Sequence, residues 1–219
     1  MADLRHTHLY GILDTGYTPR ARWQETARAL LEGGVGILQV RAKGAAAAEV
    51  EALAQEVLPL CAQAGVPLII NDQVDVAARL PGAGAHVGQD DIAPAEARAV
   101  LGPGRILGLS THSPAQIAGA LENARYLDYF AVGPVFATPT KPTYEPVGLA
   151  LVAHAASLSP PLPFFCIGGI KQNNAAQVLA AGARRLVVVS GLLLADDPAA
   201  AARAFRRILD APGKVEDRY

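Results

Sequence analysis

The sequence contains few cysteines and few aromatic residues, and its net charge is close to zero. Among its 219 residues there are two cysteines, and Phe, Trp and Tyr together make up 5%. Cys61 and Cys166 lack the spacing of metal ligands, and both lie in apolar segments, which favours buried thiols over a disulfide. The formal net charge is −1 without a basic tail, which argues against nucleic acid as a partner.

Long apolar runs are also missing. No stretch approaches the roughly 20 residues that a helix needs to cross a bilayer, and residues 1–6 hold no apolar core of a signal peptide. We therefore expect a cytoplasmic protein with no membrane partner. Histidines at the spacing of zinc ligands are absent too, which argues against a zinc hydrolase.

The abundant residues are aliphatic and follow a regular rhythm. Hydrophobic residues make up 51% of the chain, and short β-branched runs alternate with alanine-rich segments of helical period. This alternation predicts strand–helix units around a parallel sheet. We expect strands at His8–Leu13, Gly36–Val40, Pro67–Asn71, Ala85–Val87, Arg105–Leu109, Tyr129–Val132, Pro163–Ile167 and Arg185–Val189. A helix is expected after each strand, for example at Arg20–Glu32, Ala46–Ala64, Ala93–Leu101, Pro114–Glu122, Asn174–Ala181 and Pro198–Leu209.

This order of elements predicts an α/β fold, a single-domain (β/α)₈ TIM barrel over residues 1–219. Helix ends are marked by Gly65, Gly102 and Gly182. Helix starts are marked by Ser113-Pro114 and Asp197-Pro198, where a capping side chain precedes a proline of the first turn. Active sites of this fold lie at the carboxyl ends of the strands, so polar residues there are candidate functional residues.

The second expected strand leads into Gln39-Val40-Arg41-Ala42-Lys43. Strand side chains alternate between faces, so Gln39, Arg41 and Lys43 point one way and Ala42 the other. Cations on a buried strand need a partner of opposite charge. Two interpretations stay open: an ion pair with a carboxylate at the barrel rim, or a grip on a diphosphate by an arginine fork and a lysine point charge.

Acidic residues follow the third and fourth strands. Asp72 comes directly after Asn71, and Asp90 and Asp91 follow the segment 86–89. Mg²⁺ prefers oxygen ligands and often takes one or two carboxylates together with phosphate oxygens and water. We therefore expect Asp72 and Asp91 to bind Mg²⁺, with capping of the next helix as the alternative role of these carboxylates.

Hydroxyl and glycine residues follow the remaining strands. They are Ser110 beside His112, then Thr138, Thr140 and Lys141, then Gly168-Gly169, and last Ser190-Gly191. Loops after strands seven and eight are the recurrent phosphate site of this barrel, although tight packing alone can also require glycine. The sequence thus offers two anion sites, one at the cations of strand two and one after strands seven and eight. Two such sites indicate a reaction between two phosphorylated compounds, with pyrophosphate as the leaving group. His86, within an apolar strand, is expected to be a hydrogen-bonded core residue.

Seven motifs in order along the chain resemble those of thiamine phosphate synthases. They are Gln39-Val40-Arg41-Ala42-Lys43, Asn71-Asp72, His86-Val87-Gly88-Gln89-Asp90-Asp91, Gly108-Leu109-Ser110-Thr111-His112, Gly133-Pro134-Val135-Phe136-Ala137-Thr138-Pro139-Thr140-Lys141, Ile167-Gly168-Gly169-Ile170 and Val188-Val189-Ser190. Each motif alone is weak, whereas seven in this order are specific and span most of the chain.

The resemblance implies a transferase of thiamine biosynthesis. It would couple 4-amino-2-methyl-5-hydroxymethylpyrimidine diphosphate to hydroxyethylthiazole phosphate, giving thiamine phosphate and pyrophosphate in a dissociative, Mg²⁺-assisted substitution. The resemblance places Gln39, Arg41, Lys43, Asn71, Ser110 and Lys141 around the diphosphate, with Arg41, Ser110 and Lys141 as catalytic residues. It places Asp72 and Asp91 on Mg²⁺, and Thr138, Thr140, Gly169, Val189 and Ser190 on the thiazole phosphate.

Two alternatives stay open on the same barrel. A thiazole tautomerase shares the thiazole phosphate site but does not need the diphosphate residues, and a sensor of thiazole or thiamine phosphates would bind without turnover. The family often has Glu where this chain has Ala42. This position faces away from the site, so we expect altered packing or surface pairing there and no loss of catalysis. A homo-oligomer is compatible with the sequence.

Overall fold

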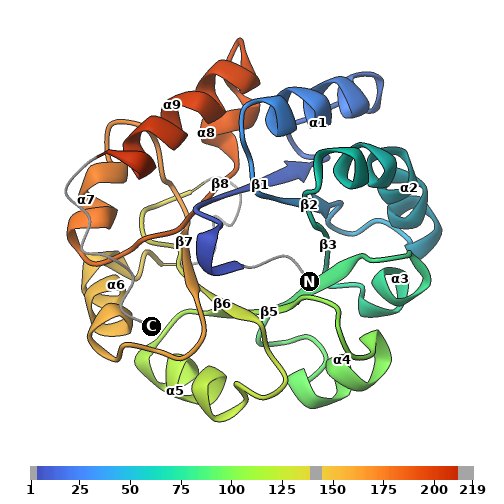
Figure 1. The fold of residues 1–219 in the computed structure, drawn as a ribbon. Helices are drawn as coiled ribbons and strands as arrows, with labels where there is room; N and C mark the ends of the chain where they lie inside the picture. The colour runs from blue at the N-terminus through green and yellow to red at the C-terminus, as the bar shows by residue number, and fades with distance from the viewer. Residues whose placement is uncertain (1–3, 139–144, 212–219) are drawn as a thin grey trace.

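The computed structural model describes residues 4–138 and 145–211, and its centre is a closed barrel of parallel strands (Figure 1). The strands pair in sequential order, and the last pairs with the first. They are β1 Leu9–Asp14, β2 Ile37–Arg41, β3 Leu68–Asn71, β4 Gly84–Val87, β5 Leu107–Thr111, β6 Tyr129–Val132, β7 Phe164–Ile167 and β8 Leu186–Val188. The predicted fold class is confirmed.

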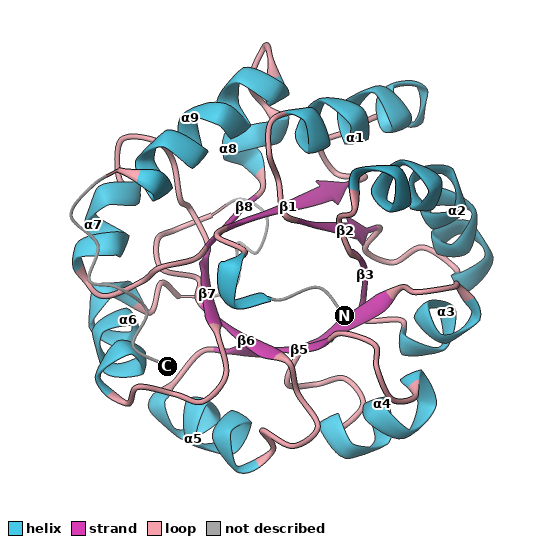
Figure 2. Cartoon of the chain, in the orientation of Figure 1, coloured by secondary structure: helices cyan, strands magenta, loops and turns pink. Residues whose placement is uncertain are grey.

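Helices surround the barrel on its outside (Figure 2). They are α1 Trp23–Glu32, α2 Ala47–Ala64, α3 Val74–Arg79, α4 Pro94–Leu101, α5 Pro114–Glu122, α6 Gly148–Ser157, α7 Ala175–Ala180, α8 Ser190–Leu193 and α9 Pro198–Asp210. Two 3₁₀ turns, η1 Leu4–His6 and η2 Arg20–Arg22, precede β1 and α1. Within the described residues, no helix combines the length and the apolarity that crossing a bilayer requires.

The alternation of side chains along each strand divides the core into two layers. On β1, Leu9 and Leu13 face the helices, whereas Tyr10 and Ile12 fill the interior of the barrel. Ala42 packs in the outer layer, as its parity predicted.

The local predictions at helix ends are confirmed. Ser113 accepts a hydrogen bond from the backbone N–H of Gln116, and Asp197 accepts one from that of Ala200. Gly65 ends α2 with a φ of 66°. Cys61 and Cys166 are free and buried.

Strand boundaries differ from the prediction mainly at β5, which lies two residues later than expected. Ser110 and Thr111 pair with Ala131 and Val132, so both belong to the strand and not to the loop after it. Arg105 lies before the strand, where its guanidinium donates to the backbone oxygens of Ala77 and Leu80. The shift moves Ser110 to a fixed position inside the barrel.

The amino-terminal turn η1 closes one end of the barrel. Leu4 belongs to the hydrophobic cluster of the barrel interior. Arg185 is buried and donates to the backbone oxygens of Leu4 and Arg5, which fixes this turn. The other end, where the strands finish, stays open to solvent.

Candidate active site

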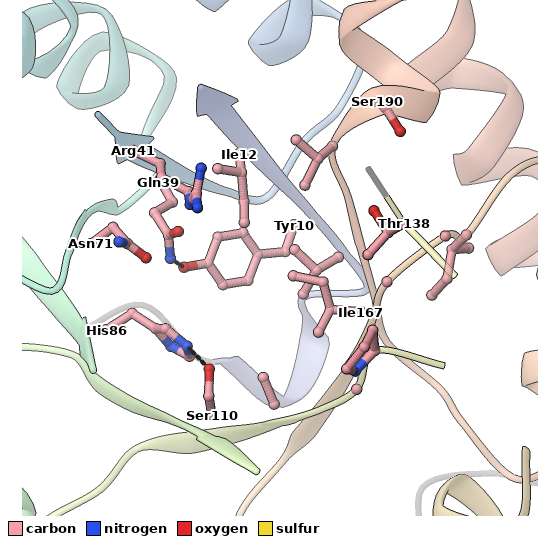
Figure 3. Close-up of a pocket in the computed structure, with 18 of the residues that line it drawn as sticks. Tyr10, Ile12, Gln39, Arg41, Asn71, His86, Ser110, Thr138, Ile167 and Ser190 are labelled. Carbon is pink, nitrogen blue, oxygen red and sulfur yellow. Dashed lines mark hydrogen bonds between the residues drawn. The ribbon is translucent and has the colours of Figure 1, made fainter. Parts of the chain in front are cut away.

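A pocket lies at the carboxyl ends of the strands, and it encloses about 840 Å³ when the space open to solvent is counted (Figure 3). Residues of all eight strands and of the segments that follow β5 to β8 line it. Eight of the predicted site residues line it: Gln39, Arg41, Asn71, Ser110, Thr138, Gly169, Val189 and Ser190.

Arg41 forms a buried ion pair at the end of β2. Its Nη1 lies 2.6 Å from Oδ2 of Asp14, and the side chain of Asp14 is 2% exposed. The strand register places these two residues directly beside each other. The second carboxylate oxygen of Asp14 accepts the backbone N–H of Gly16 at 2.8 Å. The ion-pair interpretation of Arg41 is therefore confirmed, and its remaining N–H donors are available to an anion in the pocket.

Lys43 and the two predicted metal ligands lie outside the residues that line the pocket. Nζ of Lys43 is 3.2 Å from Oδ2 of Asp72, and the lysine side chain is 70% exposed. Asp72 has a φ of 61°, and its backbone N–H donates to His86 O, which ties the ends of β3 and β4 together. Asp91 uses Oδ2 to accept the backbone N–H of Gly88 at 2.7 Å.

The carboxylates of Asp72 and Asp91 each keep an oxygen, Oδ1, that could bind a partly hydrated hard cation. The partners described above occupy only Oδ2 of each carboxylate. Across residues 4–138 and 145–211, no group of three or more His, Cys, Asp or Glu side chains is arranged to hold a metal ion. Mg²⁺ bound through two carboxylates would therefore need phosphate oxygens or water to complete its coordination.

A chain of buried hydrogen bonds crosses the floor of the pocket. Nε2 of Gln39 donates to the Tyr10 hydroxyl at 2.7 Å, and the hydroxyls of Tyr10 and Tyr129 are 3.0 Å apart. The Tyr129 hydroxyl is 2.9 Å from Nδ1 of His86, and Nε2 of His86 is 2.9 Å from Oγ of Ser110. His86 is thus a buried, hydrogen-bonded residue, as predicted, and it also lines the pocket.

The direction of donation along these hydrogen bonds decides whether the hydroxyl of Ser110 can donate to a ligand. Burial raises the pKa of Tyr10 and of Tyr129, so both phenols keep their protons. Gln39 donates to Tyr10, and we assign the direction in which Tyr10 donates to Tyr129 and Tyr129 donates to Nδ1 of His86. In this direction Nε2 of the imidazole donates to Oγ of Ser110, which leaves the serine O–H to donate to a ligand.

A second polar region follows β6, β7 and β8. Thr138 and Ser190 lie across the pocket from Gln39, Arg41 and Asn71 in Figure 3, with Tyr10 and Ile12 between the two groups. Gly169 has a φ of 64°, and a Cβ there would lie 2.6 Å from Ala137 O. Glycine is therefore required by packing at this corner, and its small size also exposes the backbone to the pocket.

The pocket combines two polar ends with a middle formed by the Tyr10 ring and Ile12, and Ile167 and Val187 add further apolar lining. Such a shape suits two ring compounds whose anionic groups point to opposite ends. Thr140 and Lys141 lie outside the described residues.

Several residues of this pocket were not predicted from the sequence. Tyr10, Asp14 and Tyr129 contribute to its floor and its ion pair. For β1 the signal was available, because Tyr10, Ile12 and Asp14 share one parity in the run Leu9–Asp14. No such signal existed for Tyr129, whose partner on β1 is 119 residues away.

Comparison with known proteins gives a consistent result. The family model described as thiamine monophosphate synthase matches residues 9–192. A thiamine-phosphate synthase of Thermus thermophilus is 46% identical over 198 residues, which cover 88% of this chain and 94% of the relative. One of Arthrobacter is 43% identical over 215 residues, covering 89% and 91%. The solved structure of a thiamine phosphate pyrophosphorylase from Pyrococcus furiosus superposes with a TM-score of 0.84 at 29% identity, over 94% of this chain and 98% of that one.

Proposed function

This chain belongs to the thiamine monophosphate synthase family, and we propose that it is a transferase that makes thiamine phosphate. Its substrates would be 4-amino-2-methyl-5-hydroxymethylpyrimidine diphosphate and hydroxyethylthiazole phosphate, and its second product pyrophosphate. The observation that carries this proposal is the pocket at the carboxyl ends of the strands, with polar groups at two ends and an apolar middle. Residues 1–219 would act as one catalytic domain, and the predicted cytoplasmic location and homo-oligomer stay predictions.

The diphosphate would bind at the end formed by β2, β3 and β5. Arg41 offers N–H donors beyond those used by Asp14, Ser110 offers its hydroxyl proton, and Gln39 and Asn71 add polar groups. Lys43 and Lys141 would add positive charge. Asp72 and Asp91 would hold Mg²⁺, which when bound would neutralise part of the charge on the leaving pyrophosphate.

The reaction needs stabilisation of charge and not a strong base. When the bond between the pyrimidine methylene carbon and oxygen breaks, its electron pair leaves with pyrophosphate. Donors already directed at that anion lower the barrier, because they need no reorganisation during the step. The apolar residues between the two ends would exclude water from the pyrimidine-methyl cation until the thiazole nitrogen attacks it.

The thiazole phosphate would occupy the end formed by the segments after β6, β7 and β8. Thr138, Thr140, Gly169, Val189 and Ser190 are the residues we propose there. This position directs the thiazole ring toward the apolar middle of the pocket, where the cation forms.

Release of pyrophosphate by the purified protein tests the proposal. Both substrates would be supplied, alone and together, with Mg²⁺ and with EDTA. We expect release only with both substrates and the metal, and a loss of about 100-fold or more in Asp72→Ala. Asp75→Ala, an exposed aspartate on α3, is the matched control and should behave as the parent protein.

Absence of release under every condition, with hydroxyethylthiazole phosphate still bound, would contradict the proposal and leave the tautomerase or the sensor. Neither alternative is favoured by the relatives described above, which carry the names thiamine-phosphate synthase and thiamine phosphate pyrophosphorylase.

A further inference from the structure

Lys171 lies at the thiazole end of the pocket and has no carboxylate partner among the described residues. It follows Gly168-Gly169-Ile170 at the end of β7. Its Nζ donates a hydrogen bond to Oγ of Ser190 at 2.8 Å. Within residues 4–138 and 145–211, this is the hydrogen bond of the ammonium group. At the opposite end of the pocket, in contrast, Arg41 pairs with Asp14 and Lys43 pairs with Asp72.

The hydrogen bond brings this cation to the wall of the pocket. Ser190 lines the pocket and is 7% exposed. Because an ammonium only donates, Oγ of Ser190 is the acceptor, and the serine keeps its own O–H to donate elsewhere. Partial burial lowers the pKa of Lys171, which means that its surroundings oppose the charge without an anion nearby to compensate.

The backbone that carries Lys171 is fixed in advance. The N–H of Lys171 donates to Oδ1 of Asn174 at 2.7 Å, and Nδ2 of Asn174 donates to Gly169 O at 3.0 Å. Gly168 and Gly169 pack against the segment after β6, where a Cβ on Gly168 would lie 2.4 Å from Cα of Pro134. A cation held on a rigid loop loses little conformational entropy when an anion binds.

We propose that Lys171 binds the phosphate of the thiazole substrate together with the hydroxyl of Ser190. This inference rests on the proposed function of the thiazole end and adds to it a cation that the family resemblance did not place there. A phosphate monoester carries its charge on oxygens that accept from both groups at once. Lys171 would therefore distinguish hydroxyethylthiazole phosphate from the unphosphorylated alcohol.

Binding measurements on Lys171→Met and Lys171→Arg test this role without depending on turnover. Methionine matches the length of the side chain and removes the charge, and arginine keeps the charge. By isothermal titration calorimetry we expect the Kd of hydroxyethylthiazole phosphate to rise about 10- to 100-fold in Lys171→Met. The Kd of the thiazole alcohol and that of the pyrimidine diphosphate should stay within about twofold, and Lys171→Arg should recover part of the loss.

Arg203→Gln on α9 is the matched control, because it removes an exposed positive charge far along the chain from the loop after β7. If Lys171→Met does not fold, chemical footprinting of the parent protein tests the same contact. Reductive methylation of Lys171, read by peptide mass spectrometry, should be slowed by hydroxyethylthiazole phosphate and not by the alcohol.

Unchanged affinity for the phosphate in Lys171→Met, an equal loss for the alcohol, or equal methylation with both ligands would overturn the inference. If the parent protein binds both substrates but releases no pyrophosphate, the proposed function fails, and the phosphate contact of Lys171 is still decided by these affinities.

Discussion

The guanidinium of Arg41 pairs with Asp14 and, in our proposal, also binds the diphosphate at the same end of the pocket. The pair is short, at 2.6 Å, and both side chains are largely buried. A buried carboxylate next to a diphosphate would repel it, so Arg41 must stay between the two anions. Asp14 therefore orients the guanidinium and does not contact the substrate in our proposal.

A double-mutant cycle measures what this pair contributes to stability. Asp14→Ala leaves the arginine without its carboxylate, and we expect the free energy of unfolding to fall by about 3 kcal/mol. Arg41→Ala should cost a similar amount, and the double variant less than the sum, because it leaves no uncompensated charge. Urea denaturation of the four proteins gives the values. Strictly additive losses would show that the two side chains do not interact energetically.

The hydroxyl of Tyr129 is the central link in the chain from Gln39 to Ser110. Tyr129→Phe removes the donor to Nδ1 of His86, so the imidazole loses what fixes its proton on Nε2. We expect kcat to fall about tenfold with little change in the KM of either substrate. The ¹⁵N chemical shifts of His86 should report the Nε2–H tautomer in the parent protein and a mixture in the variant.

Tyr126→Phe is the control for this substitution. Tyr126 precedes β6, and its ring lies beneath Arg125, outside the buried chain. Removal of its hydroxyl should change neither the activity nor the imidazole spectrum. An unaltered His86 spectrum in Tyr129→Phe would contradict the direction that we assign to the chain.

At the scale of the element, the loop after β7 is defined by how closely it approaches its neighbour. Gly169 and Gly65 have nearly the same φ, 64° and 66°, but different surroundings. A Cβ on Gly65 would meet open space, whereas one on Gly169 would lie 2.7 Å from Cβ of Phe136. The two positions therefore separate backbone strain from packing.

Alanine at each position should give different losses. Gly65→Ala should cost about 1 kcal/mol, which is the penalty of a left-handed conformation. Gly169→Ala adds an overlap with the segment after β6, and we expect a further loss of about 1–3 kcal/mol together with weaker binding of hydroxyethylthiazole phosphate. Thermal unfolding and calorimetry measure the two effects. Equal losses at the two positions would show that the close packing of Gly169 against the segment after β6 does not contribute to the loss of stability.

The elements themselves could be predicted because their signals are local. The alternation of short apolar runs with alanine-rich helices placed the strands, and Ser113 and Asp197 marked the starts of α5 and α9. The ends of β2 and β5 were misplaced by one to two residues, because the pairing with neighbouring strands, which extends β5 through Ser110 and Thr111, leaves no mark on the strand's own sequence.

At the scale of the whole molecule, closure of the barrel creates contacts that no motif contains. Tyr10 on β1 meets Tyr129 on β6 only because eight strands form a ring. The sequence predicted the polar residues at strand ends, since each follows a recognisable strand. It did not predict Asp14 or the two tyrosines, whose roles depend on partners across the barrel.

The same closure buries ionisable groups that should make the fold sensitive to alkali. Burial raises the pKa of Cys61 from 9.0 to about 12, and it raises the pKa values of Cys166, Tyr10 and Tyr129 as well. The unfolded chain therefore loses these protons at a lower pH than the folded chain does. Stability is complete below about pH 9 and is lost as the pH rises through the window between the unfolded and folded values.

Each such group should lower the free energy of unfolding by about 1.4 kcal/mol per pH unit within its window. Urea denaturation at pH 8, 9, 10 and 11, followed by the fluorescence of the single buried tryptophan Trp23, measures the slope. A Cys61→Ala/Cys166→Ala variant should lose stability less steeply above pH 9, because two of the four buried groups named above, Tyr10 and Tyr129, then remain to titrate. Identical slopes in the two proteins would mean that the thiols ionise as readily in the folded barrel as in the unfolded chain.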